Sequence, residues 1–153
     1  MAMRLKLATS TPNSGPFELP EPDDQPTCVA DGCYWARYEG HRYVYKHSEN
    51  KVQAYFSIVE GACAGVVVEL LMAVRKRAGG YAVKSARSKL GRSMRGTSGV
   101  WQWPIANLAS VEDLVVQTRT VCRDSEGEEL HADDRYSLVN RFWSDSHRPG
   151  NAP

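Results

Sequence analysis

The chain has 153 residues, 42% hydrophobic and 24% charged, which is the composition expected of one domain with a single apolar core. Its longest apolar run is broken by Glu69 and falls far short of the roughly 20 residues of a membrane-spanning helix. Residues 1–7 lack the apolar centre of a secretory signal. We therefore expect a cytoplasmic protein without membrane contact.

The net charge of +1 is an average over a polarised chain, because residues 34–103 contain twelve Lys and Arg against four acids, between two acidic segments. Four prolines between residues 12 and 22 disfavour both helix and central strand at the N-terminus. We expect a flexible Pro-rich arm over residues 1–24, a folded domain over residues 25–143 and a disordered tail over residues 144–153.

Alternating apolar and polar residues predict strands in the folded domain. His41–Lys46 and Val52–Val59 alternate with a period of two, and residues 47–50 supply the turn between them. Val66–Met72 reads as a largely buried strand, and Leu114–Cys122 alternates again.

Two short helices are expected among these strands. Ser85–Arg95 places Ala86, Leu90 and Met94 at a spacing of four, which gives a narrow apolar stripe. Asp133 and Asp134 are candidate caps for a second helix over Tyr136–Trp143. The order of elements predicts a mainly β protein: a small antiparallel barrel of the oligonucleotide-binding (OB) type, with one internal and one C-terminal helix. An SH3-like barrel and a sandwich are the alternatives.

Residues 51–65 carry a strand that ends in a bend, with the sequence F-S-I-V-E-G-A-C-A-G over its last ten residues. This stretch resembles a pattern, (F)-x-I-(V/L)-E-G-x-(Y/H)-A-G, in small, mostly uncharacterised proteins of phages and integrative elements. Residues 119–124 and 135–139 are similar to later segments of those proteins, in the same order. The resemblance implies a mobile-element setting and an OB-like barrel, since some relatives are suspected of binding single-stranded DNA. It transfers no defined site, and Cys63 stands where an aromatic residue or His is common.

The positive charge is concentrated in one short segment. Between residues 75 and 95 there are eight cations and no acid. The first three, residues 75–77, follow a strand and precede Gly79 and Gly80, so we expect them to lie on a mobile hairpin. Such a cluster repels itself unless a polyanion or an acidic protein surface neutralises it. The candidate phosphate-binding residues are Arg75, Lys76, Arg77, Lys84, Arg87, Lys89, Arg92 and Arg95.

Aromatic rings accompany this charge. Tyr43 and Tyr45 share one face of their strand, where they either pack on the core or form a platform for unpaired bases, and Tyr55 is a third candidate for stacking. Trp101 and Trp103 lie in a segment flanked by Gly, Ser and Pro that is difficult to bury fully. This pair forms a hook over bound bases, an anchor for a protein partner, or a flap over the barrel end.

Metal and catalytic signals are weak. Cys28 and Cys33 are the only closely spaced pair among the four cysteines, whereas zinc sites usually combine two such pairs. We expect no metal, no cofactor and buried reduced thiols. The acid-rich segment 126–134 has irregular ligand spacing and is interpreted as a solvated turn. No G-x-S-x-G, Walker or H-E-x-x-H motif is present, so we expect no enzyme.

The sequence thus predicts a non-enzymatic protein of a mobile genetic element that binds single-stranded nucleic acid, with DNA favoured. In this interpretation the eight cations contact phosphates, and Tyr43, Tyr45, Tyr55, Trp101 and Trp103 stack on bases. The alternative is a protein-interaction module, an inhibitor or accessory subunit, that docks on a host or element-encoded complex through its basic segment. A homodimer formed through an exposed strand edge is compatible with either.

Overall fold

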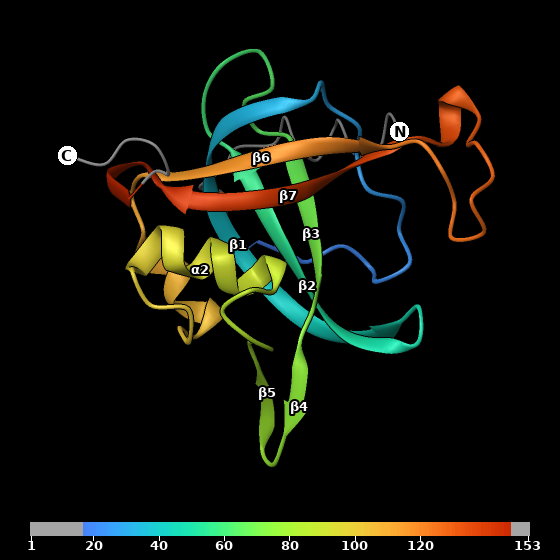
Figure 1. The fold of residues 1–153 in the computed structure, drawn as a ribbon. Coiled ribbons are helices and arrows are strands. Elements are labelled where there is room, and N and C mark those ends of the chain that lie inside the picture. The colour runs from blue at the N-terminus through green and yellow to red at the C-terminus, as the bar shows by residue number, and fades with distance from the viewer. Residues whose placement is uncertain (1–16, 148–153) are drawn as a thin grey trace.

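The computed structural model describes residues 17–147, and these residues form a mainly β domain (Figure 1), as predicted. The strands are β1 (Gly32–Lys46), β2 (Glu49–Ile58), β3 (Val67–Ala73), β4 (Arg75–Arg77), β5 (Gly80–Ala82), β6 (Leu114–Val121) and β7 (Tyr136–Ser144). The helical elements are α2 (Lys89–Ser98) and the 3-10 helices η1 (Ile105–Ser110), η2 (Ala132–Asp134) and η3 (Asp145–His147). Most of the predicted arm (1–16) and tail (148–153) lie outside the described residues.

Five strands close into a ring in the order β1-β2-β3-β7-β6, and β6 pairs with the start of β1. Every neighbouring pair is antiparallel except β3 and β7, which run parallel and meet at one residue pair, Glu69 with Leu138. At Gly40 the register of β1 on β2 shifts and φ is 145°. This bulge at a glycine bends the fifteen-residue β1. Residues 32–35 of β1 pair with β6, and residues 36–46 pair with β2.

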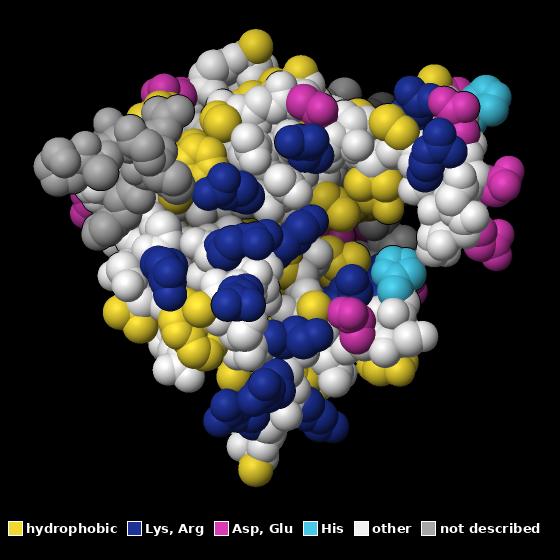
Figure 2. Space-filling view, viewed as in Figure 1, with side chains coloured by type: hydrophobic (Ala, Val, Ile, Leu, Met, Phe, Trp, Pro, Cys, Tyr) yellow, Lys and Arg dark blue, Asp and Glu magenta, His cyan; other side chains and the backbone are white. Residues whose placement is uncertain are grey.

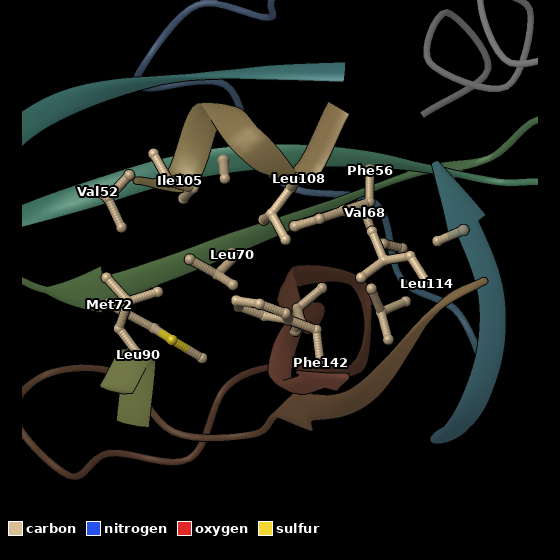
Figure 3. Packing of buried hydrophobic residues seen from close by; sticks show 14 of the residues in the cluster. Val52, Phe56, Val68, Leu70, Met72, Leu90, Ile105, Leu108, Leu114 and Phe142 are labelled. Atoms are coloured by element: carbon tan, nitrogen blue, oxygen red, sulfur yellow. The ribbon is translucent and has the colours of Figure 1, made fainter. Parts of the chain in front are cut away.

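The interior of the ring is an aliphatic and aromatic core. Val52 and Phe56 of β2 point inward with Leu70 and Met72 of β3, as Figure 3 shows. Two helical elements complete the same core: α2 contributes Leu90 and Met94, and η1 contributes Ile105 and Leu108. The alternation that predicted β2 therefore identifies its core-facing residues correctly, and the predicted strand over residues 66–72 is present as β3.

The basic tripeptide 75–77 forms β4 of a separate two-stranded hairpin, β4–β5, which projects from the ring in Figure 1. Gly79 in the turn has a φ of 83°, a conformation that glycine adopts without the steric cost of a side chain. The predicted hairpin position of these three cations is confirmed.

The predicted helix over Ser85–Arg95 is present but begins later. Ser88 is its N-cap, with its Oγ accepting a hydrogen bond of 3.0 Å from the backbone N–H of Gly91. Gly99, with a φ of 86°, ends α2. Lys84 and Arg87 consequently lie in the connection that precedes the helix.

The predicted C-terminal helix over Tyr136–Trp143 is wrong, because these residues form β7. Their apolar spacing fits both a helix and a strand, and pairing along the whole length of β6 decides for the strand. Ser137 and Val139 are buried on alternate positions, as a strand requires. Asp133 and Asp134 lie in η2 instead of capping an α-helix.

The part of the predicted flexible arm that the structure describes, residues 17–24, packs on the sheet. The carbonyl oxygen of Pro22 accepts hydrogen bonds from Lys46 Nζ and Gln53 Nε2, both at 3.1 Å. Leu19 lies against Gly40, where its side chain occupies the space that a Cβ would need. Residues 17–24 therefore cover part of the outer face of β1 and β2.

Candidate nucleic-acid interface

All eight predicted phosphate-binding cations are exposed. Three lie on β4, two in the connection between β5 and α2, and three on α2; we call these eight residues the basic band (Arg75, Lys76, Arg77, Lys84, Arg87, Lys89, Arg92 and Arg95). Figure 2 shows Lys and Arg side chains gathered over α2 and the hairpin. None of the eight forms an ion pair with an acid of residues 17–147. Their charge is thus available to an external anion.

Helix α2 presents its cations on the side away from the core. Lys89, Arg92 and Arg95 recur every three residues and are exposed, whereas Leu90 and Met94 are buried. The first turn contains no acid, and Lys89 opens it. A cation at a helix N-terminus opposes the helix dipole, so this arrangement does not favour helix stability. It does favour the binding of an anion along the helix.

Two further arginines extend the band, and the sequence analysis missed them. Arg119 of β6 and Arg141 of β7 are exposed on the strands beside α2. Arg119 lines a hollow of about 190 Å³ together with Lys89, whose Nζ donates a 3.3 Å hydrogen bond to Oδ1 of Asn140. The Arg141 guanidinium lies 5.7 Å from the centre of the Trp143 ring. Both arginines belong to the acidic last third of the chain and lie 22 residues apart in the sequence, so the pairing of β6 with β7 is what brings them to one face.

The predicted stacking rings have different surroundings. Tyr45 is 70% exposed and follows Tyr43 by two residues on β1. Tyr43 is half-buried and stacks on Tyr81 of β5, with 4.2 Å between ring centres and 18° between planes. Tyr55 is 1% exposed, under the guanidinium of Arg42, which lies 5.8 Å from the ring centre. The assignment of Tyr55 to base stacking is therefore wrong, because its ring is covered.

A pocket of about 330 Å³ lies between β1, the hairpin, α2 and the segment after it. Tyr43, Tyr81 and Trp103 line this pocket, and Arg77 of the basic band lines it with them. Trp101 is also half-buried but is not among the lining residues. The fold thus brings rings from three separate segments to one cation of the band. Tyr81 was missed by sequence reasoning, since its role depends on the contact with Tyr43.

Burial sets the protonation of the groups beside the pocket. The Tyr38 hydroxyl and Nδ1 of His41 share a hydrogen bond. The His41 ring packs edge to face on Tyr43, with 5.2 Å between the ring centres. Burial lowers the pKa of His41 and raises the pKa of Tyr38 to about 12. Burial also raises the pKa of Tyr43. Near neutral pH the imidazole and both phenols are uncharged, which leaves Arg77 as the charged group at this pocket.

The thiols differ from their predicted burial. Cys28, Cys33 and Cys122 are exposed and Cys63 is partly exposed, all as free cysteines. Within residues 17–147 no group of three or more His, Cys, Asp or Glu is arranged to hold a metal ion. In the acid-rich segment, Oδ1 of Asp124 accepts hydrogen bonds from the backbone N–H groups of Glu126 and Glu128, an arrangement that stabilises a turn.

Comparisons with protein-family models, with curated proteins and with solved structures find no match to this chain. The function is therefore inferred from the geometry and charge of the described residues. In the part of the chain that the structure describes, no helix has the length and apolar character needed to cross a membrane.

Proposed function

We propose that this protein binds single-stranded nucleic acid, with DNA favoured, that it performs no chemistry, and that it serves a mobile genetic element. One observation carries the proposal: an uncompensated basic band ends at a pocket lined by three aromatic rings. Cations along a groove hold a phosphate backbone, and rings stack on bases that have no partner strand. A duplex keeps its bases stacked internally, so it would use the cations and not the rings.

We further propose that the closed sheet is an OB-type barrel. Its five strands follow a ring order in which the third and fifth barrel strands, β3 and β7, close the ring in parallel. Helix α2 lies between the third and fourth barrel strands, β3 and β6, and packs on the core. A five-stranded Greek-key barrel with these features is the framework on which many oligonucleotide-binding proteins are built.

The proposed interface differs from the face that OB barrels commonly use. That face consists of the second and third strands with the loops between strands one and two and between strands four and five. Here Gln53 and Tyr55 on the outer side of β2 are buried, and Gln53 donates to Pro22 of the covering segment. The loop between β6 and β7 is acidic, with six Asp and Glu between residues 124 and 134. We therefore propose that the nucleic-acid strand lies along the β4–β5 hairpin and α2.

Equilibrium binding tests this proposal. Fluorescence anisotropy of a labelled oligothymidylate of about 30 nucleotides should show binding that a duplex of equal length does not match. The double variant Arg87→Glu/Arg92→Glu should weaken binding by about tenfold or more, because two phosphate contacts become repulsive. Arg123→Glu is a single-site control, since Arg123 is exposed in the acidic segment outside the band, where its Nη1 donates a hydrogen bond to the carbonyl oxygen of Gly127. Equal affinity for duplex, or equal loss in the control, would overturn the proposal.

The second candidate is a protein-interaction module that docks on an acidic surface. The exposed side chains of Trp35 and Val59 favour it, since exposed apolar groups serve protein contacts as well as bases. Charge reversal in the band weakens binding in both cases. Tyr45→Ala separates them, because loss of this ring should weaken nucleic-acid binding and leave docking through the basic segment intact.

A further inference from the structure

We propose that the pocket beside the hairpin receives one unpaired nucleobase of the bound strand, with the adjoining phosphate on Arg77. This inference rests on the proposed function and gives the interface a defined base-binding position. The pocket is separate from the outer face of β2 and β3, because β2 contributes only its core-facing Val52, and the walls come from β1, the β4–β5 hairpin, α2 and residues 102–106.

The size and lining of the pocket fit one base. Its volume of about 330 Å³ lies at the lower end of the range for small-ligand sites, roughly 300–1,000 Å³. Its floor is formed by buried aliphatic side chains, among them Val52, Leu90 and Ile105. A single base fits within such a space, whereas several stacked bases exceed it.

The aromatic residues of the pocket are already in place for stacking. The rings of Tyr43 and Tyr81 stack with 4.2 Å between their centres, and the His41 ring packs edge to face on Tyr43. Rings that are fixed before binding lose little conformational entropy when a ligand arrives. Trp103 supplies the largest aromatic surface in the lining, from the segment between α2 and η1.

Polar groups at the pocket suit the edge of a neutral base. Nδ1 of His41 shares a hydrogen bond with the Tyr38 hydroxyl, so Nε2 is the ring nitrogen left for a ligand. The lowered pKa of His41 keeps its imidazole neutral. Gln102 is exposed at the pocket and offers both a donor and an acceptor. Arg77 is exposed and has no acidic partner within residues 17–147, so it is available for a phosphate oxygen. A flat, neutral ring with an attached phosphate matches this set.

A pocket-filling variant with a matched control tests the inference. Ala106 and Ala109 are both exposed on η1, but only Ala106 lines the pocket. Ala106→Phe should reduce the affinity for oligothymidylate about tenfold and leave the affinity for an abasic oligomer of equal length unchanged, because only the base enters the pocket. Ala109→Phe should change neither affinity. Thermal unfolding of both variants establishes that the fold is retained.

A second measurement uses mononucleotides. Titration with dAMP and with dTMP, followed by NMR, should shift the indole N–H signal of Trp103, assigned with the Trp103→Phe variant, and Ala106→Phe should abolish the shift. The inference is overturned if the wild-type protein binds oligothymidylate but Ala106→Phe binds it equally well and mononucleotides leave Trp103 unchanged. In that outcome the proposed function stands. Absence of any oligonucleotide binding by the wild-type protein overturns the proposed function instead, and the mononucleotide titration then decides the pocket separately.

Discussion

At the scale of single residues, exposure decides which rings can serve the interface. Tyr45 is 70% exposed and Tyr55 is 1% exposed, although they lie on adjacent strands and both belong to alternating segments. We expect Tyr45→Ala to weaken binding of single-stranded DNA about tenfold, since stacking on one base contributes about 1–3 kcal/mol. Trp35→Ala is the control, because Trp35 is an exposed ring near the other end of β1. An equal loss in both variants in an anisotropy titration would contradict a specific stacking role for Tyr45.

His41 gives a prediction about pH. Burial lowers its pKa in the folded protein, while the unfolded chain keeps a value of about 6.5. The unfolded state therefore binds more protons in this range, and the contribution of His41 to stability, present above about pH 6.5, is lost as the pH falls. Thermal unfolding between about pH 7.5 and pH 5 should show a smaller acid-induced loss of stability for His41→Gln than for the wild type. A parallel pH dependence of the two proteins would show that His41 titrates normally.

The sequence allowed the exposed cations to be predicted, because Lys and Arg are rarely buried without a partner. It did not allow the exposed rings to be distinguished from the buried ones. A period of two indicates that Tyr43 and Tyr45 share a face of their strand, but it does not indicate whether that face is covered. The contact of Tyr43 with Tyr81 depends on where the hairpin folds, and the burial of Tyr55 depends on Arg42 and on neighbouring segments.

At the scale of elements, the first turn of α2 packs closely on the segment that precedes it. Gly91 lies next to the backbone of Ser85, where an added Cβ would overlap the carbonyl oxygen. We expect Gly91→Ala to destabilise the protein by about 1–3 kcal/mol through overpacking, although helix propensity alone would predict a gain of about 1 kcal/mol. Gly96→Ala is the comparison within the same helix. A Cβ added at Gly96 would lie 3.3 Å from its nearest neighbour, Trp143 Cβ, and so meets less crowding than one added at Gly91. Chemical denaturation measures both, and a stabilised Gly91→Ala protein would contradict the close approach of α2 to Ser85.

Local patterns identified β2, β3 and β6 and the hairpin position of residues 75–77. They failed for residues 136–144, where the spacing of Leu138, Val139 and Phe142 suits either a helix or a strand. The partner strand β6 determines the outcome there, and a long-range pairing leaves no local signal. The packing of residues 17–24 on β1 and β2 was missed for a similar reason, because prolines exclude helix without excluding an ordered extended segment.

At the scale of the whole molecule, the closed sheet separates two kinds of surface. The outer side of β2 is covered by the chain itself, whereas α2 and the hairpin carry cations with no acidic partner among the described residues. The polarity of the sequence predicted this division of charge. It did not predict that Arg119 and Arg141 join the basic face, since the order of strands around the ring places them there.

The salt dependence of oligothymidylate binding tests the central claim most directly. A plot of log Kobs against log salt concentration should be steep, with a slope of about −3 or steeper, since each phosphate contact on a single strand contributes about −0.7. Neutralisation of two band residues in Arg87→Gln/Arg92→Gln should make the slope shallower by about 1.4, and Arg123→Gln should leave it unchanged. A slope near zero, or the same slope in all three proteins, would contradict the assignment of the basic band to a nucleic-acid backbone.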